Sequence, residues 1–246
     1  MNRYHRQELY EAIGKEGQRK IRNTTVAIVG IGALGSVSSE LLCRSGIGKL
    51  ILIDRDFVDL TNLQRQVLYE ESDIGRPKAM AAEEHLKRIN SEIKIESHVI
   101  DLNFRNIENI LKEADIIIDG TDNLETRFLI NEYSLKYKKP WIHGSAIQDR
   151  GFVVSFSGNC PCFQCIIKEA GTLGTCDTLG VMNSITSLIG SMQASECIKM
   201  ILGRNKTSLI HVKLMNNKFD IMAIKKNPKC PACNGCYDYL EGRKGH

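Results

Sequence analysis

Residues 24–35 read Thr24-Thr-Val-Ala-Ile-Val-Gly30-Ile-Gly32-Ala33-Leu-Gly35, and this stretch decides the fold of the chain. The apolar run predicts a buried strand, and the Gly-x-Gly-x-x-Gly turn leads from it into a helix. Gly30 permits the tight turn, Gly32 lets a phosphate approach the backbone, and Gly35 lets the helix pack closely against the strand. Phosphates would lie at the positive end of the helix that begins near Ala33.

A second strand runs from Lys49 to Asp54 and ends in an acidic residue. Asp54 follows Gly35 by roughly 20 residues, the separation expected for a carboxylate that binds a ribose. Strand, glycine turn, helix, strand and acid together predict a nucleotide-binding unit. The alternative is a glycine-rich turn that only packs against a sheet.

The residues that follow this acid are unusual for a dehydrogenase, in which we would expect another helix and little charge. Asp56, Thr61 and Asn62 are polar and Arg65 is cationic, all close behind Asp54 in the sequence. A positive charge beside a phosphate site favours chemistry on the phosphates.

Lys78 follows Gly75-Arg-Pro77 and is expected to begin another helix. A cation at the start of a helix is unfavourable unless an anion lies nearby, which favours a phosphate contact. The alternative is an ordinary exposed lysine.

Asp122 and Asn123 come soon after a buried strand that ends at Asp119. Ligands of parallel sheets bind outside the carboxyl ends of the strands, so we expect both residues at the mouth of the nucleotide site. There the Asp122 carboxylate could hold Mg²⁺ against the phosphates. Alternatively, Asp122 caps the helix predicted over residues 123–138, or the two roles are split with Asn123.

Composition limits the function classes. The chain has 246 residues, 42% of them hydrophobic, and its net charge of +4 is too mild to argue for nucleic acid. No apolar run reaches the length of a membrane span and the N-terminus does not resemble a signal peptide, so we expect a cytoplasmic protein without a membrane partner. In that compartment, nine cysteines are more typical of metal ligands or catalytic thiols than of disulfides.

We predict a single α/β domain over residues 1–246, with a Rossmann-like, doubly wound and mainly parallel sheet. Residues 1–22 are expected to form an amphipathic helical arm, and residues 23–144 the nucleotide-binding half. Residues 145–246 form a second half. Alternating strands without intervening helices begin near Gly151, so the sheet is expected to continue into antiparallel strands.

Two Cys-x-x-Cys pairs, Cys162 with Cys165 and Cys230 with Cys233, are typical of a tetrahedral zinc site. They lie too far apart in the sequence for a compact zinc finger, so the metal would clamp a loop to the region near the C-terminus. Additional cysteines nearby leave the register of the ligands ambiguous. The alternative is free thiols or a redox pair.

Cys176 and Arg6 are two further candidate site residues, and each has an ordinary alternative role. Cys176 lies in a glycine- and threonine-rich loop outside the zinc pairs, which makes it a candidate nucleophile or a bystander thiol. Arg6 lies in the N-terminal arm, where a solvated surface arginine is the simple alternative.

Together these motifs resemble the E1-like (ubiquitin-activating-like) family in its small bacterial form, the ThiF/MoeB/HesA sulfur-carrier adenylyltransferases. The resemblance covers almost the whole chain. Ordinary Rossmann dehydrogenases lack both the Asn-Leu-Gln-Arg-Gln stretch and the distant zinc pairs. The residues on which the resemblance rests are Arg6, Gly30 to Gly35, Asp54, Thr61 to Gln66, Gly75 to Lys78, Thr121 to Asn123, the cysteine pairs and Thr175 to Thr178.

The resemblance implies a reaction with ATP as substrate and with Mg²⁺ and Zn²⁺ bound. The C-terminal Gly-Gly carboxylate of a small ubiquitin-fold carrier, bound by residues 145–246, would attack the α-phosphate, forming an acyl-adenylate and releasing pyrophosphate. The acyl-adenylate would then be converted to a thiocarboxylate. Asp54 would fix the ribose, Asn62 the phosphate end, Arg65 and Lys78 would supply positive charge, and Asp122 would hold Mg²⁺.

The family also implies a homodimer in which Arg6 acts across the interface. Thr175-Cys176-Asp-Thr resembles the thiamin-thiazole branch, in which Cys176 would link covalently to the carrier. The alternative is the molybdopterin-synthase branch, in which the carrier would be the small subunit of molybdopterin synthase. A separate protein would donate the sulfur, since no sulfurtransferase domain follows Cys233. An NAD-dependent oxidoreductase and a zinc-stapled, non-catalytic scaffold are the remaining alternatives.

Overall fold

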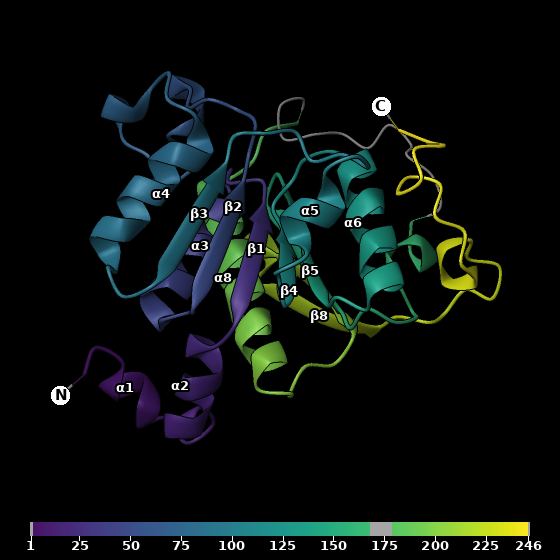
Figure 1. Cartoon of the computed structure of the whole chain (residues 1–246), viewed down its shortest axis with the longest axis horizontal. Coiled ribbons are helices and arrows are strands. Elements are labelled where there is room, and N and C mark those ends of the chain that lie inside the picture. The colour runs from purple at the N-terminus through teal and green to yellow at the C-terminus, as the bar shows by residue number, and fades with distance from the viewer. Residues whose placement is uncertain (1, 168–178, 246) are drawn as a thin grey trace.

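A computed structural model describes residues 2–167 and 179–245. Eight strands form one sheet in the order β3-β2-β1-β4-β5-β6-β7-β8 (Figure 1). The first five are parallel and the last three antiparallel, which confirms the predicted fold class. The strands are β1 (Thr25–Val29), β2 (Lys49–Ile53), β3 (Lys94–His98), β4 (Ile116–Asp119), β5 (Trp141–Ile147), β6 (Arg150–Phe156), β7 (Ser208–Lys213) and β8 (Lys218–Ala223).

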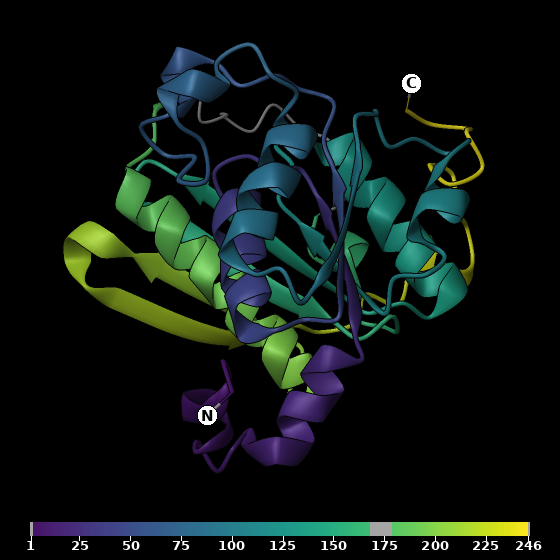
Figure 2. The same cartoon turned by 60° about the vertical axis from the view of Figure 1, so that its left-hand side comes forward.

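Helices cover both faces of the sheet (Figures 1 and 2), so its central strands are apolar on both sides. α3, α4 and α8 pack on one face, whereas α5 and α6 pack on the other. Within β1, Val26 and Ile28 contact the first helical layer, and Ala27 and Val29 the second. The helices are α1 (His5–Glu8), α2 (Gly14–Arg22), α3 (Gly35–Ser45), α4 (Lys78–Ile89), α5 (Ile107–Leu111), α6 (Leu124–Tyr137) and α8 (Asn183–Ile201). None of the described helices is long and apolar enough to cross a membrane.

The order of the strands places a crevice between β1 and β4. The chain runs from β1 outward through β2 and β3 and then returns to β4 on the other side of β1. Helices that leave such neighbouring strands in opposite directions open a crevice at their carboxyl ends, where ligands of this fold class bind. Gly30 and Gly120 follow these two strands, and a methyl group on Gly30 would lie 2.8 Å from the Gly120 carbonyl.

Gly35 brings helix α3 against the turn that follows β1. A methyl group at this position would lie 2.0 Å from the backbone oxygen of Gly30. The close packing expected of the last glycine in the motif is therefore confirmed, and it involves backbone atoms that cannot move aside as a side chain would.

The N-terminal arm is helical but consists of two helices, α1 and α2. Gly14, with a φ of 60°, lies at the start of the second. Tyr4 is buried, whereas Leu9 and Tyr10 are 62% and 63% exposed, although the sequence pattern places them on the apolar face. The arm precedes β1 and lies at the end of the sheet where β1 begins (Figure 1).

Replacing Gly35 by alanine is expected to lower the free energy of unfolding by about 2–4 kcal/mol, because the added carbon collides with backbone. Denaturant unfolding measures the change. Gly32→Ala is the matched control, since its added carbon would have only Gln66 Nε2 nearby, at 3.7 Å. We expect the control to stay within about 0.5 kcal/mol of wild type. Equal losses in both variants would contradict the packing role of Gly35.

Candidate functional site

A cavity of about 730 Å³ lies at the carboxyl ends of β1, β2, β4 and β5. This volume lies within the range of small-molecule and cofactor sites. Most of the nucleotide-binding candidates from the sequence line it, although they come from separate segments of the chain. They are Gly30, Gly32, Ala33, Asp54, Asp56, Asn62, Arg65, Lys78, Asp122 and Asn123.

The buried carboxylate of Asp54 shapes the glycine turn. One oxygen accepts a hydrogen bond from Ile31 N at 2.7 Å and the other from Asp56 N at 2.8 Å. Burial raises the pKa of Asp54, against the effect of these backbone bonds and of the nearby Lys78 charge. Because each carboxylate oxygen has a second lone pair, Asp54 can still accept a ribose hydroxyl.

Lys78 begins α4, as predicted, and its side chain is only 8% exposed. Its ammonium lies 3.3 Å from the carboxylate of Asp56, so the unfavourable cation at the helix start has an anionic partner within the chain. Tyr69 holds this segment against the glycine turn, because its hydroxyl donates to Ile31 O at 2.7 Å and lies 3.2 Å from Lys78 O. Lys78 is therefore a fixed cation at the cavity wall.

Thr61 and Gly35 do not line the cavity. The hydroxyl and N–H of Thr61 both donate to Asp59 Oδ1, at 2.6 and 2.8 Å, so this residue stabilises a turn. The same turn presents Asn62 to the cavity, and Arg65 donates back to Thr61 O at 2.9 Å. A direct contact from Thr61 to a nucleotide thus has no support from this geometry.

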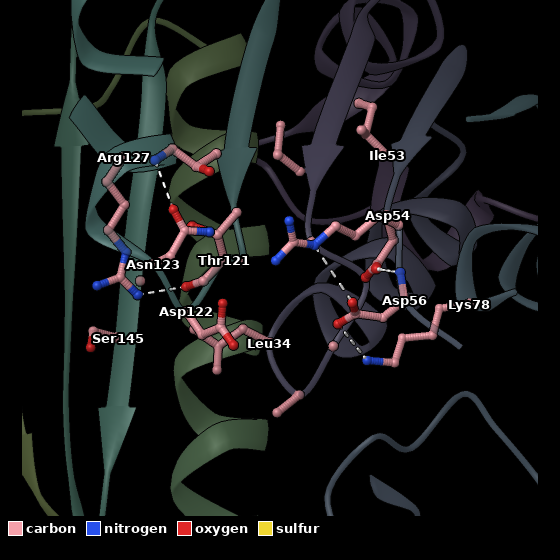
Figure 3. Close-up of a pocket in the computed structure, with 18 of the residues that line it drawn as sticks. Leu34, Ile53, Asp54, Asp56, Lys78, Thr121, Asp122, Asn123, Arg127 and Ser145 are labelled. Carbon is pink, nitrogen blue, oxygen red and sulfur yellow. Dashed lines mark hydrogen bonds and ion pairs between the residues drawn. The ribbon is translucent and has the colours of Figure 1, made fainter. Parts of the chain in front are cut away.

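Asp122 is exposed in the middle of the cavity (Figure 3). It does not cap α6, because Asn123 takes that position and accepts a hydrogen bond from Thr126 N at 2.8 Å. The alternative that Asp122 is the helix cap is therefore wrong. Among residues 2–167 and 179–245, no hydrogen bond or ion pair engages the Asp122 carboxylate, which leaves it able to bind a cation.

A buried polar network behind Asp122 was not predicted. Asp119 accepts hydrogen bonds from Thr121 N and Oγ1 at 2.9 and 2.6 Å, and from His143 Nδ1 at 2.6 Å. It also forms an ion pair with Arg127, whose Nε lies 3.6 Å away. Asp119 and His143 are paired in the register of β4 and β5. In the sequence, Asp119 follows the apolar run of β4 and His143 follows Trp141 and Ile142 in β5, and these two polar residues are the signal that could have indicated the pair.

The two members of this pair titrate under opposing influences. Burial alone would raise the pKa of Asp119, but the hydrogen bond from His143 and the charges of His143 and Arg127 hold it below its usual value. Burial lowers the pKa of His143 despite the bond to Asp119. The network therefore holds an ionised carboxylate beside a neutral imidazole, and Nδ1 carries the proton because a carboxylate can only accept.

Two further candidates, Arg6 and Cys176, are not assigned to the cavity by this structure, for different reasons. Arg6 is exposed on α1, which lies at the end of the sheet where β1 begins (Figure 1), and it does not line the cavity of its own chain. Cys176 lies outside the described residues.

The two Cys-x-x-Cys pairs converge in a second candidate site. The sulfur atoms of Cys162, Cys165, Cys230 and Cys233 all lie within 4.8 Å of one another. Individual separations of 3.4 to 4.0 Å fit the spacing of about 3.8 Å for four sulfurs at 2.3 Å from one zinc ion. The other two nearby thiols point elsewhere: Cys160 towards the Cys233 carbonyl and Cys236 towards Asp238.

Comparison with known proteins identifies the family. The sequence model of the ThiF family matches residues 4–232. This chain belongs to the ThiF family. The match covers the cavity and three of the four clustered cysteines, ending one residue before Cys233, and it confirms the resemblance inferred from the motifs.

Two curated relatives of this ThiF-family chain carry different substrate names. One is the sulfur carrier protein ThiS adenylyltransferase of Bacillus subtilis, 35% identical over 238 residues, which cover 94% of this chain and 71% of the relative. The other is the molybdopterin-synthase adenylyltransferase of Escherichia coli, also 35% identical, over 239 residues that cover 95% of this chain and 96% of the relative. The equal identities do not separate the two branches.

Solved structures of E. coli MccB are similar across nearly the whole ThiF-family chain. The structure with MccA-N7isoASN has a TM-score of 0.84 at 26% identity and covers 95% of this chain and 75% of that one. The structure with ATP has a TM-score of 0.82 at 26% identity, over 95% and 74%. The ThiF-family core therefore has a solved counterpart that was crystallised with ATP.

Helix α6 connects the cavity to the cysteine cluster. Its fully buried Asn131 donates to Cys162 Sγ at 3.7 Å and accepts from Phe163 N at 2.9 Å. The neighbouring Glu132 accepts from Tyr239 N and Leu240 N at 2.8 and 2.9 Å. Such outer contacts orient metal ligands, so the donor set, the spacing and the supporting bonds all fit zinc.

Purified protein is expected to contain about one zinc ion per chain, and removing it should lower the melting temperature, because the metal would tie the loop at 162–165 to the segment at 230–233. Metal analysis and thermal unfolding with a chelator measure both. Cys230→Ala should lose the metal, whereas Cys160→Ala and Cys236→Ala, the matched controls, should keep it. Metal loss in the control variants, or unchanged stability without zinc, would contradict the four-cysteine assignment.

Proposed function

We propose that this ThiF-family protein transfers AMP from ATP to the C-terminal carboxylate of a small ubiquitin-fold sulfur carrier that ends in Gly-Gly, releasing pyrophosphate. One observation carries the proposal: the cavity joins the glycine turn, which would bind phosphate, to the cations Arg65 and Lys78 and to the unengaged carboxylate of Asp122. The names of the curated relatives support the same reaction class.

The reaction joins two anions, and this determines what the cavity must supply. A carboxylate oxygen of the carrier forms a bond to the α-phosphorus, while the bond from that phosphorus to the pyrophosphate oxygen breaks. Arg65 and Lys78 would reduce the repulsion and stabilise the charge on the phosphates. Asp122 would hold Mg²⁺, which supplies charge neutralisation to the departing pyrophosphate. Asp54 would fix the ribose, and Asn62 the phosphate end.

The carrier class is the finer part of the proposal. We favour the carrier of thiamin thiazole biosynthesis, because Thr175-Cys176-Asp-Thr resembles that branch. The small subunit of molybdopterin synthase is the second candidate, which the equal identity to the E. coli relative supports. In either case a separate sulfur donor would complete the thiocarboxylate, and in the first Cys176 would link to the carrier.

Exchange of pyrophosphate into ATP is expected only when a Gly-Gly-ended carrier is present, and a panel of ThiS-type and molybdopterin-synthase carriers identifies the preferred one. Asp122→Ala should lower the exchange rate by about 100-fold or more, because the leaving group loses its metal. Asp220→Ala, which removes an acid on β8, is the control and should retain exchange. Undiminished exchange in Asp122→Ala would refute the metal role, whereas hydride transfer with NAD would favour an oxidoreductase.

Arg6 is proposed to act in the cavity of a second copy, because α1 lies at the end of the sheet where β1 begins, whereas its own cavity lies at the carboxyl ends of the strands. We expect a homodimer in solution, and Arg6→Ala and Asp122→Ala should each be inactive. A reassociated equal mixture should recover about a quarter of wild-type activity, since half the dimers are mixed and each has one complete site. No recovery from mixed dimers would place Arg6 outside the partner's site.

A further inference from the structure

The cavity has two differently charged ends (Figure 3). Asp54, Asp56 and Lys78 lie at one end, beside the glycine turn that would bind the nucleotide. Arg127 lies at the other end, next to Ser145, and Asp122 projects between them. The proposed function assigns partners to the first end and to Asp122 but leaves Arg127 without a substrate contact.

The guanidinium of Arg127 is held in place by Thr121 and Asp119. Its Nη2 donates to Thr121 O at 2.5 Å, and its Nε faces Asp119, so the protein fixes one edge of the guanidinium. The side chain is 11% exposed, and within the described part of the chain Asp119 is the only carboxylate to which it forms an ion pair. Asp119 is itself fixed by Thr121 and His143. A second edge of the planar fork remains available to a ligand in the cavity.

The wall beside Arg127 is formed by β5 and β6. Gly144, Ile147 and Phe152 line this end. A methyl group on Gly144 would lie 2.6 Å from the Gln193 side chain, so the wall is already packed from behind. A wall of backbone and largely apolar side chains beside a fixed cation would seat the last residues of a polypeptide and orient its terminal carboxylate.

We propose that Arg127 binds the C-terminal carboxylate of the carrier tail and positions it for attack on the α-phosphate. The inference rests on the proposed function, because it assumes that a protein C-terminus enters this cavity. Arginine offers two parallel N–H groups to a carboxylate, which fixes the direction of the oxygens as well as attracting them. Because His143 is neutral, the charges of Asp119 and Arg127 balance behind the tail.

The test compares a ThiS-type carrier bearing the terminal carboxylate with the same carrier amidated at its C-terminus, each bound in the presence of a non-hydrolysable ATP analogue. Wild-type protein should bind the acid about 10- to 100-fold more tightly than the amide. Arg127→Gln should reduce this preference to about twofold while the affinity for the ATP analogue stays within about twofold. Arg55→Gln removes an arginine from the other end of the cavity and should retain the preference for the acid.

Arg127→Lys is a second variant that controls for misfolding. It keeps a positive charge opposite Asp119 but lacks the paired N–H groups of the guanidinium. It should bind the acid with a preference below about tenfold. A preference equal to wild type in either variant overturns the role of Arg127. If wild-type protein binds neither form of any Gly-Gly-ended carrier, the proposed function itself fails, and with it this inference.

Discussion

The structure depends on a contact between backbones that only glycines permit. The ends of β1 and β4 and the start of α3 meet at Gly30, Gly120 and Gly35, where any added methyl group would lie within 3 Å of backbone atoms. This contact brings the first amides of α3 close to the end of β4, where Asp122 leaves the sheet. The nucleotide end of the cavity and its acidic centre are therefore neighbours because three side chains are absent.

Helix α6 links the cavity to the cysteine cluster. Asn123 caps its start at the cavity, Arg127 lies one turn further on, and Asn131 and Glu132 hold the cysteine cluster and the C-terminal segment. A helix capped at one end and hydrogen-bonded to the cysteine cluster along its length has little freedom to move. The distant cysteines thus stabilise the wall that carries Arg127, although they take no part in the chemistry proposed there.

The sequence predicted those features that local patterns determine. Apolar runs and the glycine motif indicated the mixed sheet, and the spacing of Cys162, Cys165, Cys230 and Cys233 indicated the cluster. The Asp119–His143 pair was missed because it arises from the register of two strands separated by helix α6. Thr61 shows a second limit of sequence patterns: it belongs to the segment that forms the cavity, but its side chain turns to Asp59. Proximity in sequence does not determine where a side chain points.

The charges of the cavity suggest why two cations are held by carboxylates before any substrate binds. Lys78 is paired with Asp56 and Arg127 with Asp119, so neither cation is an isolated charge at a partly buried wall. The pairs differ in burial: Asp56 is 57% exposed, whereas Asp119 is fully buried. Phosphates can replace Asp56 at Lys78 because that carboxylate can turn to solvent. Asp119 cannot leave, so Arg127 keeps its orientation whatever enters the cavity. Lys78 can exchange its anionic partner and Arg127 cannot, which suits the proposed reaction, in which pyrophosphate leaves while the acyl group stays aligned.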